Sequence, residues 1–456
     1  FSIKNNSILL ENKDPVYFND SEINWVDSIL NTLSIEQRIG QLFMVAANGK
    51  NLDELYYQKI DSLIRDYYVG GLIFFQSGPN HLKSLLSRYN SYADFPLLAA
   101  LDGEWGVSMR LDSAQTFPWM MTLGAIQDNR LIYDFGVQVA KQFRQLGLHI
   151  NFAPVLDINN NPNNPIIDRR SFGESADLVS LKGLAYMRGL QDNNILACGK
   201  HFPGHGDTDI DSHLALPVIN HSRDRLDSVE LFPFQKLINK GIGSIMVAHI
   251  KLPKIDSLNL PASISKQVIV DILKNDMNFN GIIVSDALNM NALSDYINPG
   301  ERELNAFLAG NDILLFPTHI KKSIELIKLE ISKDPLLEVQ LNESCRKIIM
   351  LKKWVGLFNE KEEKVINDIN LQSDSAKLLN RKLSKSAITL LRNNNVIPIK
   401  TSDSLKIAYV LMGSDSGNYF YDRLNSYVPV SRYKYNSKID TNLEYDLLTC
   451  LSNYDV

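Results

Sequence analysis

Eight short apolar runs along the first two thirds of the chain constrain its fold more than any other feature. Each run is rich in β-branched and aliphatic residues, and most segments between them are long enough for a helix. Several of these segments carry apolar residues at helical spacing, as at Phe135, Val139 and Phe143. The runs are IGQLFMV (39–45), VGGLIFF (69–75), FPLLAALD (95–102), HINFAPVLDI (149–158), ILACGKHF (195–202), GIGSIMVAHI (241–250), GIIVSDA (281–287) and NDILLFP (311–317).

This alternation of strand and helix signals predicts an α/β fold with a parallel sheet covered on both faces. Eight repeats in roughly 290 residues favour a closed (β/α)8 barrel, the TIM-barrel architecture. A doubly wound open sheet is the alternative. Against it, no GxGxxG follows the first strand signal and GxxxxGK[ST] is absent, so the nucleotide-binding motifs common in open sheets are missing.

A chain of 456 residues is too long for one ordinary hydrophobic core, so we expect more than one domain. The run KIAYVLMG and the helical pattern after it predict the opening of a smaller α/β sandwich domain, which we expect to be incomplete at Val456. The predicted organisation is an N-terminal extension (1–21), a barrel (22–320), a helical connector (321–382) and the start of the second domain (383–456).

Composition narrows the classes of partner. The formal net charge is −5 and no basic block is present, so the sequence lacks the electrostatic footprint of a nucleic-acid-binding protein. Three widely spaced cysteines exclude a disulfide framework and a CxxC metal site. No apolar run approaches the roughly 18 residues of a membrane span. The start FSIKNN, without methionine, is compatible with a removed export leader, and we expect a periplasmic or cell-envelope location, with the cytoplasm as the alternative.

Polar residues follow several of the predicted strands. In a barrel, the carboxyl ends of the strands form the face where catalysis takes place. The third run leads into Asp102, Glu104 and Arg110, the loop after the fourth contains Arg170, and the seventh ends at Asp286. Each has a structural interpretation of its own: Asp286 as a helix N-cap, Asp102 with Arg110 as an ion pair, Arg170 as a loop anchor. Because these residues are all expected at the same face of the barrel, we favour a catalytic site over separate structural roles. We interpret His249 as a core histidine and leave it out.

The fifth run opens into KHFPGHGDTDIDSH (200–213), with three histidines and three aspartates. Pro203 and Gly204 oppose the helix that a His-x3-His zinc motif needs, and the calcium-loop pattern fails at its sixth and twelfth positions. No GxSxG is present, so a serine triad has no support. Proton-transfer chemistry on a glycine-containing loop remains, and we expect neither a metal nor another cofactor.

This stretch resembles, almost letter for letter, the loop KHFPGHGDTxxDSH of family 3 glycoside hydrolases of the bacterial β-N-acetylglucosaminidase type. DGEWGVSMR, RSFGE and SDALNM are similar to three further segments of that family. The resemblance runs from about residue 35 to residue 317, and the tail after residue 383 looks like the start of the smaller domain that many members carry. The sequence departs from the family pattern at one position: Ala287 stands where the family commonly has a second acidic residue. This departure concerns the specificity within the family and leaves Asp286 in place.

The resemblance implies a role for each matching residue. Asp286 would be the nucleophile that forms a covalent glycosyl-enzyme, and His213 the acid/base with Asp211 as its partner. The residues that would hold the sugar hydroxyls and the 2-acetamido group are Asp102, Arg110, Arg170, Lys200 and His201. An imidazole suits the acid/base role because its unperturbed pKa of about 6.5 already lies near neutral pH.

The sequence therefore predicts a retaining exo-β-N-acetylglucosaminidase that releases terminal N-acetylglucosamine from peptidoglycan fragments. Three alternatives stay open: a family 3 β-glucosidase, a phosphorylase, and a non-catalytic glycan-binding envelope protein. A phosphorylase is considered because a neutral histidine repels an incoming phosphate less than a carboxylate does.

Overall fold

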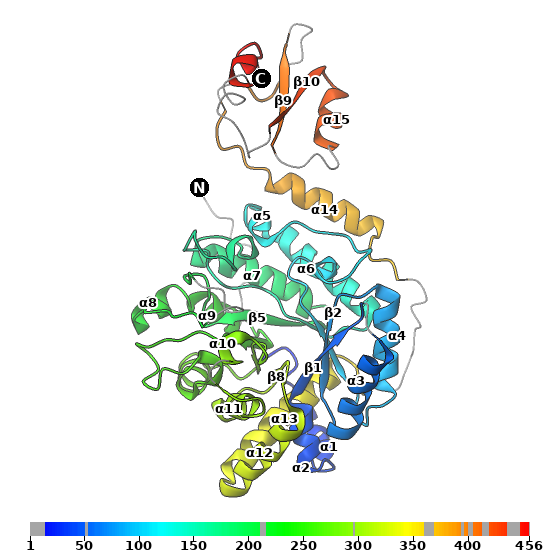
Figure 1. Ribbon diagram of the computed structural model, residues 1–456, viewed down its shortest axis with the longest axis vertical. Helices are drawn as coiled ribbons and strands as arrows, with labels where there is room; N and C mark the ends of the chain where they lie inside the picture. The colour runs from blue at the N-terminus through cyan, green and yellow to red at the C-terminus, as the bar shows by residue number, and fades with distance from the viewer. Residues whose placement is uncertain are drawn as a thin grey trace. The chain divides into compact units, whose positions relative to one another are not determined.

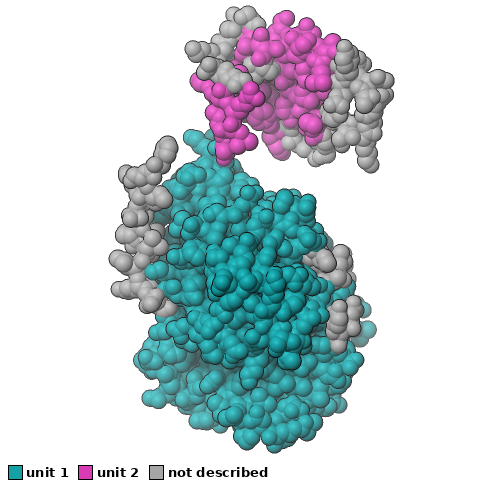
Figure 2. Space-filling view, turned by 90° about the vertical axis from the view of Figure 1, so that its left-hand side faces the viewer, with its two compact units in different colours: residues 1–388 teal, residues 389–456 magenta. Residues whose placement is uncertain are grey.

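The computed structural model describes residues 14–455 except 51–52, 210–215, 295–296, 360–368, 394–395, 400–404, 413–418 and 436–446. These residues form two compact units, 1–388 and 389–456, which Figure 2 shows in two colours. Among the described residues, no helix combines the length and the apolar character needed to cross a bilayer.

The first unit is a (β/α)8 barrel whose eight strands are all parallel (Figure 1). Neighbouring strands in sequence are neighbours in the sheet, and β8 returns to pair with β1. A bridge between Val284 and Ile313 closes the ring between β7 and β8. The strands are β1 (Phe43–Asn48), β2 (Gly71–Phe75), β3 (Leu98–Leu101), β4 (Ile150–Asn151), β5 (Leu196–Phe202), β6 (Ser244–Val247), β7 (Ile282–Ser285) and β8 (Leu314–Leu315).

Helices cover the outside of the barrel (Figure 1). In α6, the side chain of Asp128 accepts from Arg130 N at the N-terminus and Gly147 ends the helix in the left-handed conformation. The helices of this unit are α1 (Ile23–Leu30), α2 (Ile35–Gln41), α3 (Glu54–Tyr67), α4 (Pro79–Asn90), α5 (Met120–Gly124), α6 (Asn129–Leu146), α7 (Ala176–Gln191), α8 (Arg223–Ser228), α9 (Phe232–Ile238), α10 (Asn291–Ser294), α11 (Glu301–Ala309), α12 (Ile320–Lys333), α13 (Leu336–Trp354) and α14 (Asp374–Ala387). Shorter 3-10 turns are η1 (Asp20–Glu22), η2 (Val107–Met109), η3 (Asp168–Arg170) and η4 (Ala262–Ile264), and η5 (Gln267–Asp276) is π-helical.

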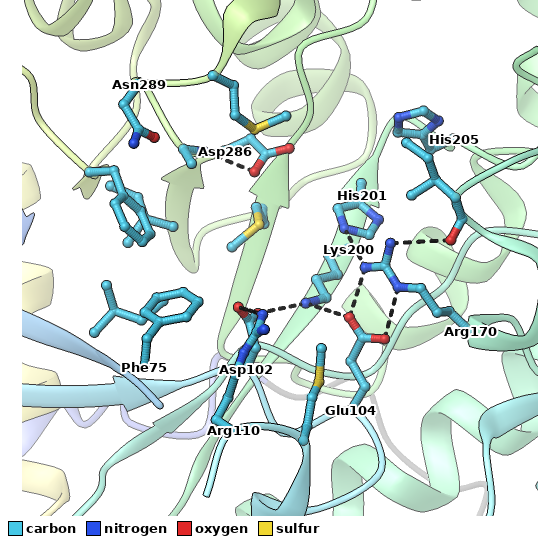
Figure 3. Close-up of a pocket in the computed structure, with 18 of the residues that line it drawn as sticks. Phe75, Asp102, Glu104, Arg110, Arg170, Lys200, His201, His205, Asp286 and Asn289 are labelled. Atoms are coloured by element: carbon cyan, nitrogen blue, oxygen red, sulfur yellow. Dashed lines mark hydrogen bonds and ion pairs between the residues drawn. The ribbon is translucent and has the colours of Figure 1, made fainter. Parts of the chain in front are cut away.

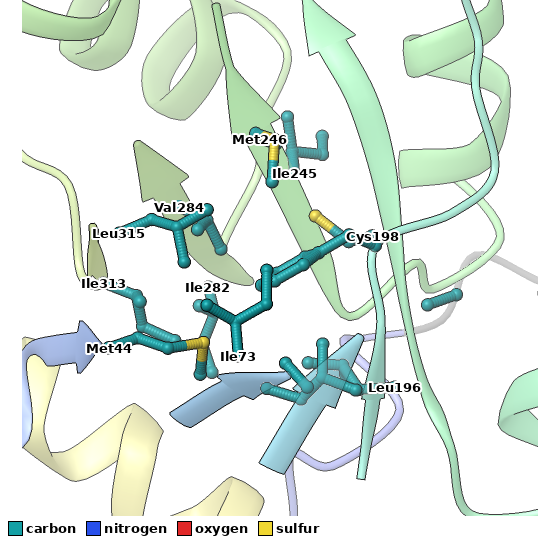
Figure 4. Packing of buried hydrophobic residues seen from close by; sticks show 14 of the residues in the cluster. Met44, Ile73, Leu196, Cys198, Ile245, Met246, Ile282, Val284, Ile313 and Leu315 are labelled. Carbon is teal, nitrogen blue, oxygen red and sulfur yellow. The ribbon is translucent and has the colours of Figure 1, made fainter. Parts of the chain in front are cut away.

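The barrel interior is a packed apolar core, which Figure 4 shows from close by. Side chains from several strands, including Met44, Ile73, Leu196 and Ile282, fill it and are almost completely buried. The interior of the barrel is therefore filled by side chains and does not form a pore, as in other barrels of this type.

Two details differ from the expected segments. The first apolar run was expected from residue 39, but Ser34 and Gln37 form a capping box that starts α2 and carries helix through Gln41, so β1 begins at Phe43. The segment 321–382 was expected as a connector. Its helices α12 and α13 pack on α2, and α13 also packs on β7, so they belong to the barrel unit.

The segment expected as an N-terminal extension also contributes to this unit. Of its residues, 14–21 are described, and Tyr17 is buried in the main core. The second unit contains a two-stranded parallel sheet of β9 (Ile407–Met412) and β10 (Val430–Tyr435), with α15 (Tyr419–Asn425) between them in sequence.

Candidate active site

A cavity of about 580 Å³ opens at the carboxyl ends of the barrel strands. Six of the eight residues predicted for the site line it, from four different strand-end segments (Figure 3). These six are Asp102, Arg110, Arg170, Lys200, His201 and Asp286. The other two, Asp211 and His213, lie outside the described residues. The structure thus brings together side chains as far apart in sequence as β3 and β7, because parallel strands present their carboxyl ends to one rim.

Lys200 is the centre of a charged cluster on one side of the cavity. Its ammonium donates to Asp102 Oδ1 at 2.8 Å and lies 2.9 Å from Glu104 Oε1. Arg110 Nη2 donates to the other oxygen of Asp102 at 2.9 Å. Burial alone would raise the pKa of Asp102, but Lys200 and Arg110 outweigh it and hold this pKa below its ordinary value. Asp102 is therefore a carboxylate at neutral pH, oriented from two sides.

Arg170 extends this cluster through a two-pronged ion pair. Its Nε and Nη2 donate to the two oxygens of Glu104 at 3.0 and 2.7 Å. Glu104 is 1% exposed, and burial works to raise its pKa, yet Arg170 and Lys200 lower it far below the ordinary value. Because both oxygens of Glu104 are committed to cations, Glu104 is a support for Lys200 and Arg170 and is unsuited to donate a proton.

The carboxylate of Asp157, which follows β4, contacts both His201 and His205. One oxygen of Asp157 lies 2.6 Å from His201 Nδ1, and the other accepts from the backbone N–H of His205 at 2.6 Å. His205 Nδ1 contacts Thr208 Oγ1 at 2.7 Å. Burial lowers the pKa of His205, so its ring is neutral at neutral pH.

Asp286 lies directly after β7, across the cavity from the charged cluster (Figure 3). Its backbone N–H donates to Val247 O at 2.9 Å, and its Oδ1 accepts from the N–H of Ala287 at 2.8 Å. The next helix, α10, begins only at Asn291, so Asp286 is not its N-cap. This carboxylate is anchored to rigid strand ends and lines the cavity, as a group that must meet a fixed reaction centre requires.

An apolar wall completes the cavity. Phe75 from the end of β2 and Phe316 after β8 meet edge to face, with ring centroids 5.4 Å apart. The guanidinium of Arg110 lies over the Phe75 ring at 4.6 Å from its centroid. A cavity with charged donors and acceptors on one side and aromatic rings on another suits a sugar, whose hydroxyls and C–H faces have the same division.

Two residues that the sequence prediction did not include in the site are Glu104 and Asp157. Asp157 lies inside the predicted run 149–158, and Glu104 lies two residues past the run that ends at Asp102, so both were within the strand-end segments from which the site was predicted. No pattern in the sequence indicates that their side chains contact other site residues. His249, which was left out, is buried outside the cavity lining, with Nδ1 2.6 Å from Ser263 Oγ.

One group of side chains with the types and spacing of metal ligands occurs among the described residues. Ligand atoms of Asp207, His221 and Glu230 lie within 4.8 Å of one another. Their oxygens and nitrogen already make contacts, because His221 Nε2 is 2.8 Å from Asp207 Oδ2 and Arg225 donates to Glu230 at 2.9 Å. A guanidinium at the same oxygen opposes a second cation, so we interpret the group as an ion-pair network.

Comparison with known proteins gives a consistent result. Beta-hexosaminidase A of Pseudoalteromonas piscicida is 32% identical over 387 residues, which cover 78% of this chain and 64% of that protein. The beta-hexosaminidase of Methylobacillus flagellatus is 35% identical over 274 residues, 58% of this chain and 78% of that protein. A solved glycoside hydrolase family 3 β-N-acetylglucosaminidase from a Paenibacillus species superposes with a TM-score of 0.77 at 30% identity, over 92% of this chain and 83% of that one.

The chain thus spans less than two thirds of the length of the first of these relatives. The family assignment does not depend on how much of these relatives the chain covers, because a family model matches the chain itself. Residues 34–351 match the glycosyl hydrolase family 3 N-terminal domain, and this range contains every strand of the barrel and every residue that lines the cavity. The chain therefore belongs to glycosyl hydrolase family 3.

Proposed function

We propose that this protein is a retaining exo-β-N-acetylglucosaminidase. The observation that carries the proposal is the position of Asp286. Its carboxylate lies at the end of β7 and faces the charged side chains of Asp102, Arg110 and Lys200 across the cavity. The names of the relatives, two beta-hexosaminidases and a β-N-acetylglucosaminidase, support the choice of an N-acetylated amino sugar.

In the proposed reaction, a carboxylate oxygen of Asp286 attacks C1 of the terminal sugar and the bond from C1 to the leaving oxygen breaks. An acid must protonate that oxygen at the same time, and water then releases the sugar with retained configuration. We assign the proton transfers to His213 with Asp211, on the basis of the sequence motif. The sugar is bound from the side of the cavity opposite Asp286, by Asp102, Arg110, Arg170, Lys200 and His201.

An exo mode of action, in which one terminal sugar ring is bound, is part of this proposal. The cavity of about 580 Å³ lies within the usual range for small-molecule sites, and the ion pairs of Glu104 with Arg170 and Lys200 lie on one side of it. We propose terminal N-acetylglucosamine of peptidoglycan fragments as the substrate. Incubation with defined muropeptides, followed by mass spectrometry of the products, tests this choice: loss of one N-acetylglucosamine supports it, and intact fragments contradict it.

Chromogenic substrates test the reaction itself. We expect kcat/KM for 4-nitrophenyl N-acetyl-β-glucosaminide to exceed that for the glucoside, and Asp286→Asn to lower kcat by roughly 1000-fold, equivalent to about 4 kcal/mol of activation free energy. Adding inorganic phosphate should not produce sugar phosphate. Preference for the glucoside, or formation of sugar 1-phosphate, would move the assignment to a β-glucosidase or a phosphorylase.

A further inference from the structure

The carboxylate of Asp157 makes a set of contacts that goes beyond anchoring a loop. It lies at the end of the β4 segment, its side chain is completely buried, and it faces the first turn after β5. It accepts from the backbone N–H of His201 at 3.2 Å and of His205 at 2.6 Å, and it contacts the ring nitrogen Nδ1 of His201 at 2.6 Å. A buried carboxylate that spends one oxygen on a histidine ring restricts which nitrogen of that ring carries hydrogen.

The second nitrogen of the ring completes this restriction. His201 Nε2 lies 3.3 Å from Nη2 of Arg170. Arginine has five N–H donors and no acceptor, so this contact is a hydrogen bond only if Nε2 offers a lone pair. Arg170 is itself fixed by its two bonds to Glu104. Nε2 must therefore be free of hydrogen, and Nδ1 must carry the hydrogen that Asp157 accepts.

The lone pair on Nε2 matters because His201 and Arg170 line the cavity together. With hydrogen on Nε2, the ring would point an N–H at an N–H of Arg170, and the two side chains could not form a hydrogen bond. With a lone pair there, Nε2 accepts from Nη2 of Arg170, which is also bound to Glu104, and the ring and the guanidinium are held against each other in the cavity wall.

We propose that Asp157 is a positioning residue that fixes His201 in the tautomer with hydrogen on Nδ1, so that Nε2 accepts from Arg170 and the two side chains are held in place in the sugar site. The consequence for sugar recognition rests on the proposed function. The tautomer itself does not, because it is a property of the protein without substrate. A purely structural role, in which Asp157 only ties the turn after β5 through backbone N–H groups, is the competing interpretation.

Nitrogen NMR of the unmodified protein, labelled with [15N]histidine, tests the tautomer directly. We expect the Nδ1 signal of His201 at a shift typical of a protonated nitrogen and the Nε2 signal at a shift typical of a bare one, at pH 7.5. The signals are assigned by their loss in His201→Gln. A ring with hydrogen on Nε2, or on both nitrogens, overturns the proposal whether or not the protein cleaves any glycoside.

Asp157→Asn tests the dependence on the carboxylate. An amide keeps one oxygen for the backbone N–H groups but presents N–H to Nδ1, which drives the ring toward the opposite tautomer. We expect the His201 signals to exchange character or broaden. Asp256→Asn is the matched control, because Asp256 is also buried and its described side-chain hydrogen bonds are with the backbone N–H groups of Leu258 and Leu260, not with a histidine. The control should leave the His201 signals unchanged.

Kinetics separate positioning from structure. We expect Asp157→Asn to lower kcat/KM by roughly 10- to 100-fold, the usual effect of removing a partner that orients a ring. If Asp157 acts through His201, the double variant with His201→Gln should be within about 3-fold of His201→Gln alone, since effects on one unit are not additive. Additive losses, with an unchanged tautomer in Asp157→Asn, would show a structural role only.

Discussion

At the scale of single residues, Glu104 explains how a charged cluster is maintained inside this barrel. It is almost completely buried, and a carboxylate in such a place is stable only when cations and hydrogen bonds replace the lost water. Arg170 and Lys200 supply them. Networks of this kind contribute little net stability relative to an apolar core, but removing one member leaves its partners buried without compensation.

This predicts a pH-dependent cost for Glu104→Gln. The pKa of Glu104 is lower in the folded than in the unfolded chain, so its contribution is fully present above the unfolded value of about 4.3 and is lost as the pH falls toward the folded value. We expect the variant to lose about 3 kcal/mol of unfolding free energy at pH 7. The difference from the unmodified protein should shrink steadily below about pH 4.3.

Urea unfolding at pH 7, 5, 4 and 3 measures this difference. Glu330→Gln is the control, because Glu330 pairs with Lys333 on the surface and its loss should change stability little at any pH. A cost of Glu104→Gln that stays constant down to pH 3 would mean that the carboxylate is not held ionised by its neighbours.

The sequence was sufficient to predict six cavity residues because each lies at the end of a strand signal or in a recognisable segment. It did not predict the contacts between them. That Lys200 lies between Asp102 and Glu104, or that Asp157 reaches His201 from another strand, depends on the register and closure of the barrel. Neither is encoded in any local pattern.

At the scale of elements, all eight predicted strands are present, because buried parallel strands form near-continuous apolar runs that are easy to recognise. Their lengths were less predictable. The run 149–158 contributes only Ile150–Asn151 as a strand, and Pro154 lacks a backbone N–H for the sheet, although Val155 still forms a bridge with Lys200 of β5. The π-helical form of η5 had no signal that we recognised.

The turn after β5 gives a prediction at this scale. A Cβ at Gly206 would lie 1.7 Å from the carbonyl oxygen of Ile158, so only glycine allows the turn to lie this close to the β4 segment. We expect Gly206→Ala to displace the turn that carries His205, a residue that lines the cavity, and to lower kcat/KM by at least roughly 10-fold.

Gly78→Ala is the matched control, because a Cβ at Gly78 meets nothing within 4 Å and the backbone there has an ordinary conformation. Initial rates and circular dichroism of both variants decide the matter. Equal activity of the two variants would mean that the approach of Gly206 to Ile158 has no bearing on the site.

At the scale of the whole molecule, the two units differ greatly in core size. The barrel unit contains one large cluster of buried apolar residues. In the described part of the second unit, the corresponding cluster has three buried members, Ile407, Val428 and Val430. Since burial of apolar surface is the main stabilising contribution, the two units should differ in stability.

We therefore expect two transitions when this chain is unfolded in urea, with the unit at 389–456 unfolding first. Tryptophan fluorescence reports the first unit alone, and far-UV circular dichroism reports both units. Trp105, Trp119 and Trp354 all lie in the first unit, as does Trp25. Coincident transitions for both sets of probes would show that the two units unfold together.

The central claim is that Asp286 becomes covalently bound to the sugar during turnover. The most direct measurement is to inactivate the protein with a fluorinated N-acetylglucosaminide that traps the glycosyl-enzyme, digest it, and locate the added mass. We predict that the label lies on the peptide containing Asp286 and that Asp286→Asn takes up none. A label on any other residue would contradict the assignment.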